Sequence, residues 1–436
     1  MTKPGELESK DRAQWSSERA FVFSMAAAAV GLGNLWRFPY MVGENGGAAF
    51  ILAYLIALVV IVLPIMMLEV SAGRLAQGST VHTFAQVNRF GKFFGWCVVA
   101  LTAGITSYYL VITGWTLGYA VDAWRGNLRD FDVFTSGYNS VWYFIAVAVL
   151  VVALLIKGVR AIEQFSNYLM PVLLLTIVTL IVAASRMPGW AEAREFLLQA
   201  DFTRLTETRL WMFAIGQAFY SVAVGQGYLT TYGSYIPRET HVPRACLIVG
   251  ATETCIAIMA GWMIFPFVFS YGLDPGEGSQ LAFSTLPTVF QDMAWGAPLG
   301  ILFFSLFFLA AFSSCIAGMK VIIAAFAEEF DLKERTAVFS VFGLMIVLGT
   351  PSALSFTPVE LSVAGMPFLD FMDQFAGTNV VIASGVIGAA LFCWFVPRER
   401  VRGALGVRTT WWEWRIYTVG RALPFIVVAW LLWTLV

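Results

Sequence analysis

The stretch GLGNLWRFPYMVGENGG, residues 31–47, lies between two apolar runs, residues 21–30 and 48–64. A helix that crosses a bilayer must satisfy its backbone groups internally, because hydrocarbon offers no hydrogen-bond partners. Glycine pairs, an asparagine and an arginine are therefore costly at that depth. They are tolerated where the backbone lines a polar cavity or the protein interior. The stretch predicts a membrane helix that is interrupted beside a binding site.

The overall composition is that of a membrane protein. Of the 436 residues, 59% are hydrophobic and 13% are charged, whereas soluble domains carry about 25% charged residues. The 27 basic and 28 acidic residues nearly balance, so nothing favours nucleic acid as a partner. The five cysteines and two histidines are scattered, and we expect no metal cluster from them. Residues 1–18 lack the apolar segment of a signal peptide, so we expect no cleaved leader.

Eleven apolar runs are long enough to cross about 30 Å of hydrocarbon. They lie at residues 19–42, 48–73, 93–124, 141–156, 164–185, 209–236, 243–271, 298–327, 336–350, 368–396 and 416–436. Basic residues are enriched in cytoplasmic loops. If the N-terminus lies inside, the basic residues of the external loops are few. They are Arg125, Arg129, Arg186, Arg194, Arg204 and Arg209. We therefore expect a multi-pass protein of the plasma or inner membrane, with a cytoplasmic N-terminus and an external C-terminus.

A second interruption, in the sixth span, resembles the first. Gly225-Gln226-Gly227 lies in the sixth span much as Gly31-Leu32-Gly33 lies in the first. Glycines that pack helices together are an alternative, but paired interruptions indicate a binding site between inverted repeats. We therefore expect an all-α fold with unwound first and sixth helices. Its parts would be a cytoplasmic tail (1–18), two five-helix repeats (19–186 and 209–396), and a cytoplasmic loop with the eleventh helix (397–436).

The residues around these interruptions resemble the neurotransmitter:sodium symporter family. The resemblance rests on GLGNLWRFPY followed by ENGGAAF, the interrupted sixth span and the serine pair of FFLAAFSSCIAG. It extends from about Trp15 to Val396, and eleven spans are similar to the prokaryotic branch, which includes bacterial leucine and hydrophobic amino acid transporters. The resemblance implies sodium-coupled import of an amino acid or related zwitterion by alternating access. It also implies two sodium ions, no organic cofactor, and a monomer or weak homodimer in the lipid bilayer.

The resemblance implies two sodium sites made of oxygen atoms, which hard cations prefer as ligands. One site would use the carbonyls of Ala27, Val30 and Ala310 with the hydroxyls of Ser313 and Ser314. The other would use the Ala29 carbonyl, the Asn34 amide oxygen, Ser221 and the substrate carboxylate. Its last ligand is normally an asparagine, but this chain has Glu253 at that position.

Glu253 is the main departure from the family pattern. A carboxylate in mid-membrane is costly unless it is paired or protonated. In animal relatives the neighbourhood of Tyr54, Gln217 and Ser221 binds chloride. Chloride-independent bacterial relatives have an acidic residue one turn further on, where this chain has Ala257. Our hypothesis is that Glu253 supplies the negative charge in place of chloride, so that transport is independent of chloride. Glu253 would also ligate sodium. The alternatives are that it carries a proton or replaces the carboxylate of a substrate that has none.

The substrate pocket is expected between the two interruptions. Tyr109 matches the tyrosine that meets the substrate carboxylate, and the amides of Leu32 and Gly33 would add donors at a half-helix N-terminus. Gly31 stands where monoamine carriers have aspartate, which favours amino acids over amines. The other residues expected to contact the substrate are Ala28, Ala29, Ile105, Ile112, Phe219, Tyr220, Ser221, Ala223, Gln226, Ser314 and Gly318. Gln226 and the space expected at Gly318 favour a polar or larger side chain than leucine's.

Charged pairs are expected to close the pocket from either side. Externally, Arg37 would face Asp373, with Tyr109 and Phe219 closing the lid beneath them.

Intracellularly, Arg12 near Trp15 would pair with Glu328, helped by Tyr235. Arginines that extend to the membrane interface are the alternative for both gates. Lys320 has no role in the family pattern, and an acidic partner near the cytoplasmic vestibule is one explanation for it.

Other functions remain open at this stage. One alternative substrate is an osmolyte such as taurine or betaine, and one alternative coupling ion is a proton carried by Glu253. A sensor that no longer transports would keep the same fold. An enzyme would need a cluster of catalytic groups in one pocket, which the sequence does not suggest, and a channel would need a continuous polar pore.

Overall fold

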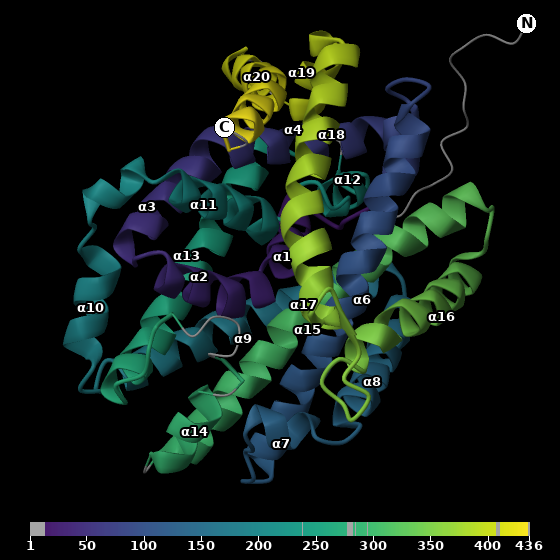
Figure 1. Ribbon diagram of the computed structural model, residues 1–436. Helices are drawn as coiled ribbons and strands as arrows, with labels where there is room; N and C mark the ends of the chain where they lie inside the picture. The colour runs from purple at the N-terminus through teal and green to yellow at the C-terminus, as the bar shows by residue number, and fades with distance from the viewer. Residues whose placement is uncertain are drawn as a thin grey trace, which may run out of the picture.

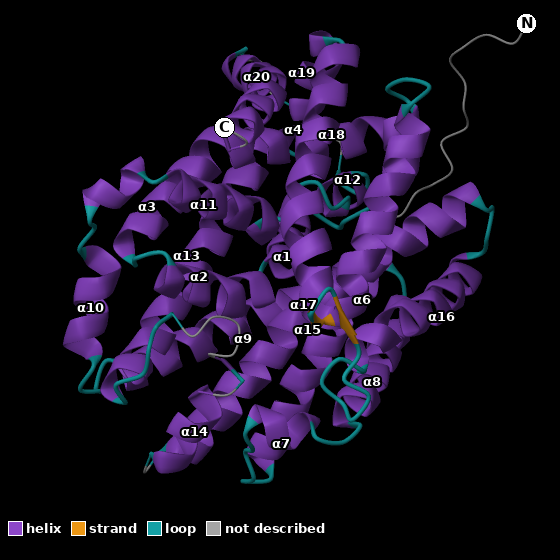
Figure 2. Cartoon of the chain, in the orientation of Figure 1, coloured by secondary structure: helices purple, strands orange, loops and turns teal. Residues whose placement is uncertain are grey.

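The computed structural model describes residues 14–237, 239–276, 282–283, 285–293, 295–406 and 410–434. The described chain is almost wholly helical, as Figure 2 shows. Two short strands, β1 (Ser362–Val363) and β2 (Met366–Pro367), pair in antiparallel fashion.

The helices of the first half follow the predicted spans closely. They are α1 (Glu18–Ala29), α2 (Phe38–Glu44), α3 (Ala48–Ala57), α4 (Leu63–Ala76), α5 (Thr80–Ala85), α6 (Gly91–Trp124), α7 (Phe131–Thr135), α8 (Asn139–Leu155), α9 (Val159–Ala184) and α10 (Trp190–Leu198). Two π-helical segments, Gly33–Arg37 and Leu58–Val62, join α1 to α2 and α3 to α4. A short 3-10 helix, Phe202–Thr206, follows α10.

The second half is also helical. Its helices are α11 (Thr208–Ser221), α12 (Tyr228–Gly233), α13 (Val242–Ser270), α14 (Thr285–Asp292), α15 (Gly296–Glu329), α16 (Glu334–Ala353), α17 (Phe368–Met372), α18 (Val381–Phe395), α19 (Arg398–Leu405) and α20 (Trp411–Thr434). A π-helical segment, Asp373–Val380, joins α17 to α18.

Seven helical runs among the described residues are long and apolar enough to cross a membrane. They are Ala48–Ala76, Gly91–Trp124, Val159–Ala184, Val242–Ser270, Gly296–Glu329, Glu334–Ala353 and Phe368–Phe395. Glu18–Ala29 and Gly33–Glu44 count as an eighth span if they are taken together, with a bend of 51°. Every expected span contains helix, but α8 is short and α11 and α12 are separated, so the count of eleven stays a prediction.

The long helices α6 and α15 pack against each other, and α1 contacts α9, α13 and α15. The alanines of α1 at positions 26–29 are buried, and small residues of this kind let membrane helices approach closely. Figure 1 shows α7 and α14 at one end of the molecule and α19 at the other. Residues 30–37 and 222–227, which form the two interruptions, are buried inside the bundle.

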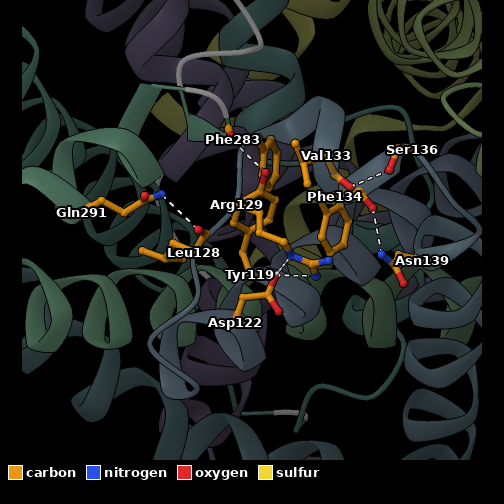
Figure 3. Close-up of polar contacts among 10 residues, drawn as sticks. All are labelled: Tyr119, Asp122, Leu128, Arg129, Val133, Phe134, Ser136, Asn139, Phe283 and Gln291. Atoms are coloured by element: carbon orange, nitrogen blue, oxygen red, sulfur yellow. Dashed lines mark hydrogen bonds and ion pairs between the residues drawn. The ribbon is translucent and has the colours of Figure 1, made fainter.

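At the end that carries α7, an ion pair holds the turn after α6. Figure 3 shows the Arg129 guanidinium against the Asp122 carboxylate, with Nε and Nη2 at 2.9 and 2.7 Å from Oδ2. The guanidinium also lies 5.5 Å from the centre of the Phe134 ring. These contacts fix the loop between α6 and α7.

The segment before α14 is tied to the same end of α6. The Tyr119 hydroxyl donates to the Phe283 carbonyl at 2.9 Å, and Gln291 donates to the Leu128 carbonyl at 3.0 Å (Figure 3). The Phe283 ring lies 6.5 Å from that of Trp36, next to the first interruption. Within the loop 272–297, α14 forms a short helix, and Phe283 covers this side of the first interruption.

Candidate functional site

The interruption of the first span is satisfied by side chains of other helices. α1 ends at Ala29. The Leu32 amide donates to the Tyr109 hydroxyl at 2.7 Å, and Gln217 Nε2 donates to the Gly33 carbonyl at 2.9 Å. Backbone groups at membrane depth need such partners. The break is thus built into the fold by α6 and α11.

The glycines of the first interruption permit close approach. A Cβ at Gly31 would overlap the Tyr109 hydroxyl and the Ser314 Oγ. A Cβ at Gly33 would lie 3.1 Å from the Tyr220 ring. Both glycines are needed because side chains of neighbouring helices fill the space beside them.

The glycines of the second interruption serve a different purpose. Between α11 and α12, Ala223, Gly225 and Gly227 have φ values of 55°, 79° and 74°. Glycine adopts this left-handed region without the steric cost that other residues meet. The two glycine triplets therefore have different physical reasons. The glycines of the first interruption allow close packing, and those of the second allow positive φ angles.

The second interruption is also fully supported by side chains. The Gly225 amide donates to the Glu69 carboxylate at 2.9 Å. The carbonyls of residues 225, 226 and 227 accept hydrogen bonds from Ser384, Thr102 and Thr80 at 2.6, 2.6 and 3.2 Å. Glu69 was not predicted as a site residue, although a carboxylate within the apolar run LPIMMLEV was a signal for it.

Neutral oxygen atoms converge where α1 meets α15. The Ser313 hydroxyl lies 2.6 Å from the Ala27 carbonyl and 2.7 Å from the Ala310 carbonyl. The Ser314 hydroxyl lies instead 3.0 Å from the Ala28 carbonyl. Val30 directly follows α1 as its C-cap. The structure thus brings Ala27, Ala310 and Ser313 together, whereas Ser314 faces Gly31 and Tyr109.

The Glu253 carboxylate is completely buried and surrounded by donors. Asn34 Nδ2 lies 2.7 Å from Oε1, and the Tyr54 hydroxyl lies 3.0 Å from Oε2. The Thr254 hydroxyl lies 3.2 Å from Oε2. A buried carboxylate needs such partners to offset its lost hydration. The structure therefore places Glu253 against Asn34, as the sequence suggested.

Gln217 connects this carboxylate cluster to Arg37. Its Nε2 donates to the Ser221 hydroxyl at 3.0 Å, and its Oε1 accepts from Arg37 at 2.9 Å. Ser221 in turn interacts with the Glu253 carboxylate. Arg37, Gln217, Ser221 and Glu253 thus form one continuous polar network beside the two interruptions.

A narrow cavity of about 30 Å³ lies between the interruptions. Its walls must separate in order to admit an organic substrate. Residues from α1, α6, α11, α12, α15 and the unwound segments line it: Ala28, Ala29, Gly33, Ile105, Tyr109, Tyr220, Ser221, Ala223, Gln226, Tyr228 and Ser314. All except Tyr228 were expected from the sequence. Leu32 reaches this region through its amide, while Ile112 is fully buried and is not part of the lining.

Two expectations about the pocket are corrected by the structure. Phe219 does not line the cavity but packs against Gly385 of α18, while Tyr220 faces the cavity. Consecutive helical residues point about 100° apart, so the two aromatic rings cannot face the same space. Gly318 leaves no open space, because the oxygens of Thr106 and Tyr228 lie where its Cβ would be.

The expected ion pair between Arg37 and Asp373 is not formed in this conformation. Arg37 donates to Gln217 and to the Thr378 hydroxyl, the latter at 3.1 Å, and lies 4.8 Å from the centre of the Tyr220 ring. Asp373 accepts a hydrogen bond from Tyr108 at 2.8 Å. Gln217 and Thr378 are close enough to bind the guanidinium directly, so it does not extend to the carboxylate.

Trp15, which precedes α1, packs against the segment that follows the second interruption. Its indole donates to the Tyr232 carbonyl at 3.1 Å and its amide to the Tyr235 carbonyl at 2.9 Å. Arg12 lies outside the described residues. Its expected partner, Glu328, accepts from the Ser79 amide at 2.6 Å and pairs with His82.

Lys320 gains an acidic partner in the structure. Its ammonium group is buried and lies 2.6 Å from a Glu334 oxygen at the start of α16. The ammonium also lies 5.7 Å from the centre of the Tyr235 ring. Within the described part of the chain, His, Cys, Asp and Glu residues form no group of three or more that could hold a metal ion.

Comparison with known proteins agrees with this architecture. The family model described as "Sodium:neurotransmitter symporter family" matches residues 12–140 and 134–435. An uncharacterised sodium-dependent transporter of Haemophilus influenzae is 31% identical over 91% of this chain and 92% of its own length. Another from Bacillus subtilis is 34% identical over 87% of each chain.

A solved structure shares the fold closely. The crystal structure of MhsT in complex with L-phenylalanine superposes with a TM-score of 0.88 and 32% identity, covering 96% of this chain and 99% of that one. Together with the apolar helices, these matches show a multi-pass membrane protein that couples transport of a small molecule to sodium. The chain belongs to the sodium:neurotransmitter symporter family.

Proposed function

We propose that the chain imports an amino acid, or a closely related zwitterion, together with sodium by alternating access and independently of chloride. The observation that carries this proposal is the buried Glu253 carboxylate, held by Asn34, Tyr54 and Thr254 beside the interrupted α1. A fixed negative charge at this point balances a sodium ion without a mobile anion. Every partner named here can donate a hydrogen bond, which stabilises the ionised carboxylate.

The substrate end of the cavity suits a carboxylate group. The Leu32 amide donates to the Tyr109 hydroxyl at 2.7 Å, and this hydroxyl can in turn donate to an oxyanion. Amides exposed at an interrupted helix attract negative charge. Gly31 leaves no room for a side chain, so no carboxylate of the protein competes with that of the substrate. The L-phenylalanine in the MhsT complex supports an amino acid as substrate here.

We propose two sodium sites in this framework. The first would use the Ala27 and Ala310 carbonyls with Ser313, because both carbonyl oxygens lie within 2.7 Å of the Ser313 hydroxyl. The second would use Glu253 and Asn34 with Ser221 and the Ala29 carbonyl. Neutral oxygens at one site and a carboxylate at the other suit a hard monovalent cation.

The transport cycle follows from the two ends of the bundle. We propose that Arg37 and Tyr220 close the external end while Trp15 closes the cytoplasmic end, with the N-terminus inside and the C-terminus outside. Residues 19–186 and 209–396 would act as the two repeats. Sodium shifts the carrier between the two conformations because it binds them with different affinities, and the sodium gradient supplies the direction of transport.

Ser313→Ala is expected to lower the apparent affinity for sodium at least about tenfold. The variant removes an oxygen that would ligate the ion, and a hydrogen-bond partner of a charged group contributes about 1.5–3 kcal/mol. The sodium dependence of uptake into proteoliposomes measures the effect. Ser185→Ala, at an exposed serine after α9, is the matched control. An unchanged sodium dependence in Ser313→Ala would remove this residue from the site.

Uptake of radiolabelled amino acids into proteoliposomes tests the proposed function. We expect accumulation of at least one amino acid when an inward sodium gradient is imposed, and none when potassium replaces sodium. Accumulation driven by a proton gradient alone would contradict sodium coupling and favour a proton-linked role for Glu253. Accumulation of taurine or betaine but no amino acid would contradict the proposed substrate class.

A further inference from the structure

The far end of the cavity is polar although its walls are largely apolar. Gln226 lines the cavity within the unwound segment and is 4% exposed. Its carbonyl accepts a hydrogen bond from Thr102, which fixes the backbone. Its side-chain amide forms no hydrogen bond with any other described residue. The amide is therefore available to form a hydrogen bond with a group that enters the cavity.

A second polar group lies next to this amide in the chain. Tyr228, the first residue of α12, also lines the cavity, and its hydroxyl lies beside Gly318 and Thr106. The absence of a side chain at Gly318 makes room for this hydroxyl. Gly318 thus accommodates the hydroxyl group of a tyrosine that lines the cavity.

The cavity wall carries no charge among the residues that the structure describes. Apart from the polar groups at its carboxylate end, its lining consists of small or apolar side chains together with Gln226 and Tyr228. A charged substrate side chain would be left without a counter-ion there, which is costly in a low-dielectric site. A neutral side chain that both gives and accepts hydrogen bonds matches an amide and a phenol.

We propose that the substrate is an amino acid with a neutral, hydrogen-bonding side chain, and that Gln226, with Tyr228, recognises that side chain. This inference rests on the proposed amino acid transport and specifies its substrate class. A site built to hydrogen-bond a polar group rejects the analogue that lacks the group, because its own polar atoms are then left unpaired. Gln226 therefore determines specificity without taking part in sodium binding.

The test compares amino acids matched in shape. The purified full-length protein in sodium is titrated with threonine and valine, asparagine and leucine, and tyrosine and phenylalanine, and binding is followed by thermal stabilisation, with potassium as the blank. In at least one pair we expect the polar member to bind about tenfold or more tightly, since one lost hydrogen bond to a buried group is worth about 1–3 kcal/mol.

Variants assign the preference to one side chain. Gln226→Met, of similar size, is expected to remove the preference, whereas Gln164→Leu, at an exposed position of α9, is expected to keep it. Equal or tighter binding of every apolar member, a preference for charged amino acids, or an unchanged preference in Gln226→Met would overturn the inference. The comparison of polar and apolar amino acids with the wild-type protein tests the inference even if the variant does not fold. If no amino acid binds in sodium, the proposed function fails as well.

Discussion

Glu253→Gln is expected to make transport depend on chloride. The variant keeps the shape of the side chain but removes the negative charge that faces Asn34 and Tyr54. Leaving one buried charge without its partner costs about 3–5 kcal/mol. Without chloride, we therefore expect sodium-driven uptake to fall at least about 100-fold, since each 1.4 kcal/mol is a factor of about ten. With chloride, we expect a large part of the activity to return.

The restored activity has a structural reason. The hydroxyls of Tyr54 and Ser221 and the amide of Gln217 lie around the Glu253 side chain or next to it, and together they offer donors to a small anion. Uptake is measured in proteoliposomes with chloride or gluconate on both sides. Glu192→Gln, at an exposed position of α10, is the control and should behave like the wild type. A variant that loses uptake equally in both salts would show that Glu253 has another role.

Gly31→Ala is expected to weaken substrate binding strongly. The added methyl group would overlap the Tyr109 hydroxyl and Ser314 Oγ. Tyr109 would have to move away from the Leu32 amide, so the variant loses a hydrogen bond of about 1 kcal/mol and gains about 1–3 kcal/mol of overpacking. We expect the affinity for the amino acid to fall about 100-fold or more, measured by sodium-dependent binding of the radiolabelled substrate.

A matched glycine separates this effect from a general loss of stability. Gly343 lies inside α16, and a Cβ there would meet no atom within 4 Å. Gly343→Ala should bind substrate normally and unfold at an equal or higher temperature, because alanine is favoured over glycine in a helix. Normal substrate binding by Gly31→Ala would mean that the substrate carboxylate lies elsewhere.

The sequence predicted the interruptions but not how they are held open. Glycine, asparagine and arginine within an apolar run mark the break, since each is costly in hydrocarbon. The partners of the broken backbone, such as Glu69 and Thr102, come from residues far away in the chain. The position of Glu69 in an apolar run was the only indication of its role. Nothing in the sequence indicates that Thr102 would bind the interrupted backbone.

The arrangement around the pocket depends on helix rotation, which spacing alone leaves undecided. Phe219 and Tyr220 are both plausible lid residues in the sequence, and only the packing against α18 assigns them to different sides. The same holds for Arg37, which binds Gln217 and Thr378 rather than Asp373 in this conformation. By contrast, the proximity of Asn34 and Glu253 was predicted from the family pattern, because that pattern implies both as ligands of one sodium site.

The most direct test of the account is sodium-driven uptake by the wild-type protein with chloride replaced by gluconate. The medium contains the amino acid found to bind best, and an inward sodium gradient is the only driving force. If Glu253 supplies the negative charge, the initial rate in gluconate will equal the rate in chloride. A rate that collapses in gluconate and recovers with added chloride would contradict the account, because the site would then need a mobile anion in addition to this carboxylate.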